Sequence, residues 1–414
     1  MADPRAALRL PDFRRFLAAH FTTTLGIQIQ GVVVAWQMYL DTHDPLSLGL
    51  IGLAEALPNI ATSLLGGHVA DRTDRRRLAL WATTVLLACA GVLVVLAGLP
   101  RDRVHWRVVG VFIVIAVSGV ARAFLQPART ALAASMVPRE LQANAVTWRS
   151  VVWQFAAVLG PALGGVLFAA IGPRGSYVVD GSLLLVALAS LAAIQRRGVP
   201  ASDRREDLFT SLKAGIAYLR GQQVLLGAMT LDLFSVLFGG AVALLPIFAA
   251  DILHVGSWGL GLLRAAPALG AVLMSLAMAW RPPMQRAGRA LLWAVAGFGS
   301  CIIGFGLART LWVSFAFLVL SGAADMISVV IRATLLQLLV PDHLMGRVTS
   351  VNAVFIGSSN EIGSFESGLT AKLFGAVPAV LFGGGMTLGI VGITALRAPK
   401  LRAVGRLEDV GGSS

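Results

Sequence analysis

The chain alternates between long apolar stretches and short polar connections. A helix needs about 20 mostly apolar residues to cross the bilayer core, and twelve stretches meet this requirement, some with a polar residue or two inside. They are residues 17–39, 47–70, 78–99, 106–135, 143–171, 176–195, 222–250, 258–280, 289–308, 310–339, 346–375 and 377–396. A helix satisfies its own backbone hydrogen bonds in lipid, and the stretches lack the alternation of barrel strands. The pattern therefore predicts an all-α membrane protein with twelve transmembrane helices.

The longest polar stretch divides the predicted spans six and six. Residues 196–221 contain Pro, clustered charges and an amphipathic tail, which predict a cytoplasmic linker lying partly on the membrane surface. The expected domains are an N-terminal six-helix bundle (1–195), this linker, and a C-terminal six-helix bundle with a short cytoplasmic tail (222–414). Residues 129–151 align without gaps with residues 332–354, and both begin with Arg and carry Val-Pro at the same place. Parallel repeats of this kind predict two pseudo-symmetric bundles.

Composition and charge agree with a membrane setting. The chain is 57% hydrophobic and 13% charged, which is too apolar for a soluble globule of this length. Its net charge is +13, and most Lys and Arg residues lie on the side of the N-terminus. Positive residues mark the cytoplasmic side, so we expect a multi-pass inner-membrane protein with both termini in the cytoplasm. The basic excess should contact anionic lipid headgroups rather than nucleic acid.

Motifs for enzymatic chemistry do not occur in the sequence. No nucleotide-binding Gly-x4-Gly-Lys-Ser/Thr loop, His/Cys metal cluster or serine-nucleophile motif appears. The two cysteines, Cys89 and Cys301, fall inside spans, and we expect neither a disulfide nor a metal site from them. These features indicate a protein that is not an enzyme and that needs no cofactor other than a proton gradient.

Charged residues inside the spans predict a polar interior. A charge that faces lipid costs at least a few kcal/mol. The third and twelfth spans contain no charge, the ninth has only Arg289 at its first position, and the sixth has only Asp180 near its outer edge. Every third span is therefore expected to face lipid, and the other spans to surround a central cavity between the two halves. Burial disfavours the charged form of a carboxylate, so an acid beside the cavity could take up a proton on one side and release it on the other. The candidates for proton coupling are Asp232, Asp325, Glu361, Glu366 and Glu55. For Asp232 and Asp325 the alternative is a structural carboxylate satisfied by Ser, Thr or an arginine such as Arg332.

Two of these glutamates share one polar helix. At 100° per residue, Glu361 and Glu366 flank a stripe of Ser, Gly and Asn, about 140° apart. One could face the cavity while the other faces a neighbouring helix. We expect Glu361 to be the one that titrates. Further candidates for the substrate cavity are Gln28, Gln30, Trp36, Arg122, Phe234 and Asn360.

Two motifs resemble those of the major facilitator superfamily. The segment "GGHVADRTDRRRL" resembles the signature between helices 2 and 3, and the segment "AVLGPALGG" resembles the helix-5 motif of the superfamily's antiporters. The matching positions are Gly67, Asp71, Arg72, Arg75 and Arg76 in the first motif, and Gly160, Pro161, Gly164 and Gly165 in the second. Other stretches are similar to the enterobactin-exporter-like branch, which includes drug exporters. The helix-4 motif of the family is matched only partly, by the segment that begins at Arg122.

The resemblance implies a fold, two mechanical roles and a function. The first motif would latch the two halves on the cytoplasmic side, with Asp71 paired to Arg129; the alternative is a loop that only sets topology. The second motif would seal the cavity against leakage; the alternative is ordinary helix packing. In this fold the second and eleventh spans meet across the two halves, so Glu366 could meet Glu55 there. The implied function is secondary active efflux of an amphipathic drug or siderophore-like metabolite, by alternating access and proton antiport, in a monomer. A small-solute uniporter or importer, a lysolipid flippase and a metal-ion exporter are the alternatives.

Overall fold

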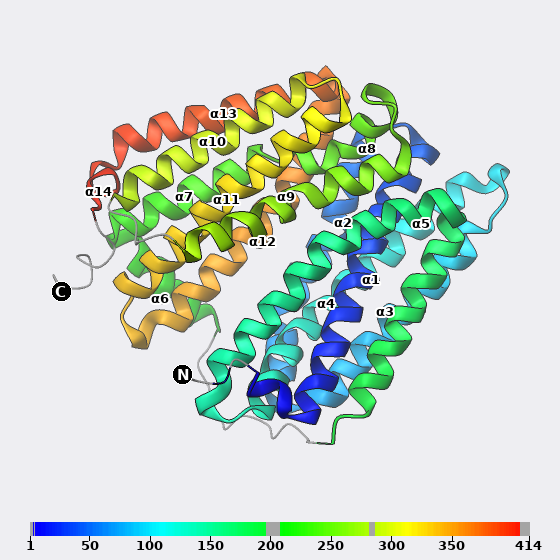
Figure 1. Ribbon diagram of the computed structural model, residues 1–414, viewed down its shortest axis with the longest axis horizontal. Coiled ribbons are helices and arrows are strands. Elements are labelled where there is room, and N and C mark those ends of the chain that lie inside the picture. Colours follow the sequence, from blue (N-terminus) through cyan, green and yellow to red (C-terminus); the bar gives the residue numbers. More distant parts are fainter. Residues whose placement is uncertain (1–2, 4, 196–207, 281–285, 406–414) are drawn as a thin grey trace. The chain divides into compact units, whose positions relative to one another are not determined.

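The computed structural model describes residue 3 and residues 5–195, 208–280 and 286–405, and all regular structure in these ranges is helical (Figure 1). The long helices are α1 (Pro11–Thr42), α2 (Pro45–Arg72), α3 (Arg75–Ala97), α4 (Val104–Met136), α5 (Gln142–Ala192), α7 (Gln223–Phe238), α9 (Gly256–Ala279), α10 (Ala287–Leu307), α11 (Leu311–Leu339), α12 (Asp342–Phe374) and α13 (Ala376–Arg397). Shorter helices are α6 (Leu208–Gly221), α8 (Leu245–Ile247) and α14 (Pro399–Ala403).

The helices account for the predicted spans. Ten helical segments of the described chain are long and apolar enough to cross a membrane. One of them contains α5, which holds two spans because Gly172 breaks it with a φ of 69°. A positive φ of this kind is readily adopted only by glycine. The 33-residue α12 supplies the predicted eleventh span, so the twelve predicted spans all have helical counterparts.

The chain divides into two compact units. The first comprises Met1–His43, Leu53–Arg204 and Val255–Ala265, and the second comprises Asp44–Gly52, Arg205–His254 and Ala266–Ser414. The start of α2 thus belongs to the second unit, and the start of α9 belongs to the first. The predicted linker 196–221 lies outside the described residues up to position 207, and its remainder forms α6.

The core of the first unit forms where α1 packs against α5, and where α3 packs against α4 and α5. Its fully or almost fully buried members include Phe13, Phe16, Leu132, Met136 and Leu191. This core fills the half of the unit that contains the chain start. The charged residues described below lie among helices that this packing holds in place.

The core of the second unit forms where α10 packs against α11 and α13, and where α12 packs against α7. Buried members include Leu231, Leu291, Leu335, Val348 and Leu401. Leu401 lies in α14, so the short terminal helix is anchored in the core. In Figure 1, α10 and α13 run side by side along this unit.

The predicted seventh span, 222–250, corresponds to the helical segment Gln223–Ile252, in which the type of helix changes partway. Helix α7 ends at Phe238, and after Gly239 and Gly240 the chain continues as η4 (Ala241–Leu244), α8 and the π-turn η5 (Phe248–Ile252). Glycine is a poor helix former, and a pair of glycines favours a break. A Cβ on Gly240 would lie 2.8 Å from the carbonyl oxygen of Gly363. The break therefore lets the backbone pack closely on α12.

Candidate functional site: charged residues inside each helical unit

A buried ion pair lies inside the second unit. Asp232 of α7 and Arg332 of α11 are only 5% and 7% exposed, and the Oδ2 atom of Asp232 pairs with Nη1 of Arg332. Arg332 also donates from Nε to the carbonyl oxygen of Ser328, at 3.3 Å. Two charges withdrawn from water are tolerated only when they are paired and hydrogen-bonded. Asp232 is thus paired with the arginine that the sequence suggested, and its role in proton coupling stays a prediction.

A second carboxylate lies on the same helix as this arginine. Asp325 precedes Arg332 by seven residues, which places it on the same face about 10 Å away along the axis. It is half-buried and makes no hydrogen bond or ion pair with the described residues. It interacts electrostatically with both Asp232 and Arg332. The Arg332 guanidinium thus pairs with one carboxylate and interacts at longer range with a second.

An ion pair in the first unit is less buried. Glu55 of α2 pairs with Nη1 of Arg122 on α4, and their side chains are 32% and 21% exposed. The Nη2 atom of Arg122 donates to Oε1 of Gln30 on α1, at 3.4 Å. Glu55 was predicted for proton coupling, and Arg122 and Gln30 were predicted for the substrate cavity; the structure brings all three together. The predicted meeting of Glu55 with Glu366 stays a prediction.

Asp180 is a buried carboxylate that our sequence analysis did not select. It lies in the second half of α5, it is 1% exposed, and neither carboxylate oxygen has a hydrogen-bond partner. It faces α1 closely, since a Cβ on Gly26 would lie 2.5 Å from its Oδ1. Arg122 interacts with it electrostatically. The signal was available in the sequence, because Asp180 is the only charge in an otherwise apolar span.

Basic residues gather in the first unit without an acid among their described contacts. Arg129 of α4 is 7% exposed. It interacts electrostatically with Arg149 of α5 and with His20 of α1, and these two residues also interact with each other. Nη2 of Arg129 and Nε of Arg149 have no hydrogen-bond partner. The side chain of Asp71, the predicted partner of Arg129, lies outside the described residues. The latch therefore stays a prediction.

The arginines of the first motif tie three helices together. Arg75 donates to the carbonyl oxygen of Ala131 on α4, at 3.3 Å, and Arg76 donates from Nε to that of Leu191 on α5, at 3.0 Å. Asp74 caps α3 by accepting from the backbone N–H of Arg76, at 2.9 Å. Such a cap satisfies a free N–H of the first helical turn. Of the other motif positions, Arg72 is exposed, and a Cβ on Gly67 would meet nothing within 4 Å.

The second motif forms a close helix contact. A Cβ on Gly164 would lie 3.1 Å from the carbonyl oxygen of Ile29 on α1. A Cβ on Gly261 of α9 would lie 2.7 Å from the carbonyl oxygen of Pro161 and 3.0 Å from Cα of Gly165. Small residues allow this approach of backbones in membrane helices. Gly160 is buried as well and faces Gln28 and Leu25 of α1.

The two glutamates of α12 have different surroundings. Glu361 faces the start of α2, where a Cβ on Gly52 would lie 2.9 Å from Oε2 of Glu361. Glu366 accepts a hydrogen bond from the hydroxyl of Thr370, at 2.8 Å. Both side chains are half-buried. The wheel argument that the two acids face different neighbours agrees with these contacts.

The remaining predicted cavity residues are unequally exposed. Trp36 and Gln30 are buried, Gln28 is half-buried, and Asn360 and Phe234 are exposed. Phe234 lines a hollow of about 210 Å³ in the second unit, together with residues of α6, α7 and α12. Whether any of these side chains contacts substrate stays a prediction.

Fold and site together define a class: a multi-pass membrane transporter of the major facilitator type. The bacterial homologue of the iron transporter ferroportin, solved in its inward-facing state, matches with a TM-score of 0.71 over 96% of this chain and 100% of its own, at 17% identity. The D-xylose-proton symporter matches with a TM-score of 0.69 over 95% of this chain and 99% of its own, at 15% identity. At such identities the likeness establishes the fold alone, and it confirms the predicted fold class.

The chain belongs to the transmembrane secretion effector family of the major facilitator superfamily, whose family model matches residues 2–409. Enterobactin exporter EntS of Salmonella typhi is 27% identical over 392 residues, which cover 93% of this chain and 92% of the relative. Enterobactin exporter EntS of Escherichia coli O1:K1 / APEC is 26% identical over 393 residues, covering 93% and 91%. The predicted family is confirmed, and the protein is a transporter rather than an enzyme.

Proposed function

We propose that the protein is a secondary exporter that moves a siderophore-like metabolite or an amphipathic drug out of the cytoplasm, by alternating access and in exchange for protons. Support for the substrate class comes from the relatives that are named enterobactin exporters. Support for proton exchange comes from carboxylates inside the helical units. The observation that carries the proposal is the arrangement of Asp232, Arg332 and Asp325.

The geometry of α11 favours an exchange of partners. Helical side chains lean toward the helix N-terminus, and the bond from Arg332 to the Ser328 carbonyl shows this lean over one turn. Asp325 lies three residues before Ser328, which is less than one further helical turn, or about 5 Å along the helix axis. A proton that neutralises Asp232 would remove its attraction for Arg332, and Asp325 is the next acceptor along the helix. The Arg332 guanidinium would thus shift along α11 toward Asp325 when a proton binds to Asp232.

Transport into proteoliposomes tests the proposal. Purified protein would be reconstituted with an internal pH dye and offered enterobactin, an amphipathic dye, a labelled lysolipid and ferrous iron in separate arms. We expect a pH gradient to drive the siderophore or the dye, with matching proton movement that an uncoupler abolishes. Asp232→Asn and Asp325→Asn should each lose gradient-driven flux, whereas Asp102→Asn, an exposed acid outside the spans, should keep it.

Each of the other outcomes would contradict a specific part of the proposal. Flux that ignores the gradient would contradict proton antiport and favour a uniporter. Movement of the lysolipid or the metal alone would favour a flippase or a metal-ion exporter. Unchanged coupling in both aspartate variants would refute the assigned carboxylates.

We further propose that both termini lie in the cytoplasm, because of the distribution of basic residues along the chain. In intact cells an impermeant thiol reagent should label Asp102→Cys and should not label Arg77→Cys, both of which are at exposed positions. The reverse labelling would overturn the orientation.

A further inference from the structure

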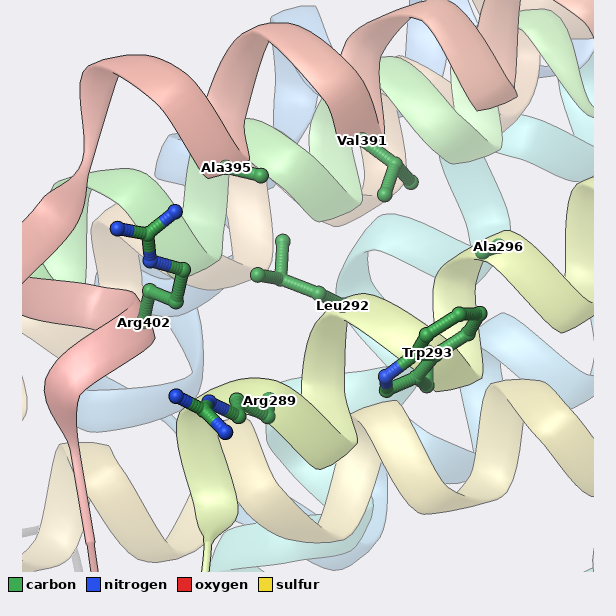
Figure 2. A pocket seen from close by; sticks show the side chains of 7 residues that line it. All are labelled: Arg289, Leu292, Trp293, Ala296, Val391, Ala395 and Arg402. Atoms are coloured by element: carbon green, nitrogen blue, oxygen red, sulfur yellow. The ribbon is translucent and has the colours of Figure 1, made fainter.

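A groove of about 480 Å³ opens between α10, α13 and α14 in the second unit (Figure 2). Arg289 and Arg402 lie at one end of the groove, and Trp293, Ala296 and Val391 lie toward the other end. These helices correspond to the ninth and twelfth predicted spans, whose lack of internal charge predicts that they face lipid. The arginines lie at the ends of these spans that the charge distribution assigns to the cytoplasmic side. The groove therefore opens where a lipid headgroup meets the acyl chains.

The terminal helix holds Arg402 in place over the groove. The backbone N–H groups of Ala287 and Gly288 donate to the carbonyl oxygens of Gly405 and Val404, at 3.0 and 3.3 Å. Gly288 is also so close to the backbone of α14 that any side chain there would collide with the carbonyl oxygen of Leu401. These contacts fix the start of α10 against the chain end. The backbone positions of the two arginines are thus set by helix packing.

The two arginines have no counter-charge in the described part of the chain. Neither Arg289 nor Arg402 makes an ion pair or a side-chain hydrogen bond there, and no acid lines the groove. Two guanidinium groups at one end of a groove present paired N–H donors that suit a phosphate. This end of the groove therefore has the charge and the donors for a phosphodiester.

The rest of the groove is apolar. Leu292, Ala296, Val391 and Ala395 form its walls, and Trp293 is 77% exposed beside them. Exposed tryptophans are characteristic of the membrane–water interface. An occupant must therefore combine an anionic head with a hydrocarbon tail that continues along α10 and α13.

We propose that this groove binds an anionic phospholipid of the cytoplasmic leaflet, with its phosphate between Arg289 and Arg402 and an acyl chain along the apolar walls. Basic pockets between helices on the cytoplasmic side are suited to such headgroups. The site is separate from the buried ion pair between α7 and α11. It does not depend on which substrate the protein exports.

Lipid titration of the purified full-length protein tests this site. Binding of phosphatidylglycerol and of phosphatidylcholine would be counted by native mass spectrometry, for the wild type and for Arg289→Gln, Arg402→Gln and the double variant. We expect tighter binding of phosphatidylglycerol by the wild type, and a loss of roughly fivefold for each arginine removed. Lys400→Gln removes the same charge from α14 at a position that does not line the groove, and it should change binding less than twofold.

A second measurement places the lipid. Brominated phosphatidylglycerol should quench the fluorescence of the wild type more than that of Trp293→Phe, and brominated phosphatidylcholine should show a smaller difference between the two proteins. Equal binding of both lipids, an equal effect of Lys400→Gln, or quenching that does not depend on Trp293 would each overturn the proposal. Displacement of the lipid by millimolar inorganic phosphate would also overturn it, because the site would then recognise a free anion.

Discussion

Removal of one charge from the Asp232–Arg332 pair gives the sharpest test of the interior. The two side chains are 6% and 8% exposed, so neither charge can recover its hydration when its partner is lost. Loss of one member of a buried pair costs about 3–5 kcal/mol, because the other charge stays buried without compensation. For a domain of about 200 residues, this corresponds to a fall in melting temperature of roughly 6–20 °C. We expect a shift in this range for Asp232→Asn and for Arg332→Gln.

The double variant distinguishes the stability contribution of the ion pair from the cost of leaving one charge unpaired. Replacing both partners of a buried ion pair by neutral groups is often close to neutral for stability. The variant with Asp232→Asn and Arg332→Gln should therefore regain most of the melting temperature that each single variant loses. Its proton-coupled flux should stay absent, since the recovered stability does not restore a titrating carboxylate.

A matched pair in the first unit provides the control. The Glu55–Arg122 side chains are 32% and 21% exposed, so a charge left alone there is less buried, and loss of its partner should cost less than in the Asp232–Arg332 pair. Glu55→Gln should therefore lower the melting temperature less than Asp232→Asn does. The measurement is fluorescence-detected thermal unfolding in one detergent for all variants. Equal shifts for Glu55→Gln and Asp232→Asn, or additive losses in the double variant, would refute the reasoning.

Three further predictions follow from the described contacts. Asp180→Asn should leave the melting temperature unchanged or raise it, because this carboxylate has no hydrogen bond to lose; a large fall would show a partner that we have missed. Gly261→Val should lower the free energy of unfolding by about 1–3 kcal/mol through overpacking. Gly389→Val should not, because a Cβ there meets nothing within 4 Å. Equal melting temperatures of the two variants would contradict this. Glu361→Gln should reduce proton-coupled efflux more than Glu366→Gln, whose carboxylate accepts from Thr370; the opposite order would reassign the titrating group.

Much of the fold could be predicted from the sequence because apolar length is a strong signal. The twelve predicted stretches match helices with small differences at their ends, and the break near residue 172 was placed correctly between two spans. The break after α7 was missed because two glycines do not interrupt the apolar character of this stretch, which still qualifies as one span. Backbone propensity, rather than hydropathy, would have located that break.

The site was harder to predict because partners lie far apart along the chain. Glu55 and Arg122 are 67 positions apart, and no local spacing relates them. Arg332 was considered as a partner for Asp232 and Asp325 because it lies seven residues beyond Asp325 on the same helical face. Asp180 was set aside because it was assigned to the outer edge of its span, although the structure places it against Gly26 in the interior of the unit.

Each unit places one arginine among two carboxylates. The sets are Glu55, Arg122 and Asp180 in the first unit, and Asp232, Arg332 and Asp325 in the second. The sequence repeat does not explain this likeness, since its register aligns Arg122 with Asp325 and Arg129 with Arg332. In both sets the arginine pairs with one acid and leaves the other without a hydrogen-bond partner in the described chain. A carboxylate without a partner costs free energy in proportion to its burial, so the cost is larger for Asp180, which is 1% exposed, than for the half-buried Asp325. Under the proposed proton exchange, the unpartnered acid of each set is the place where a bound proton would remove that cost.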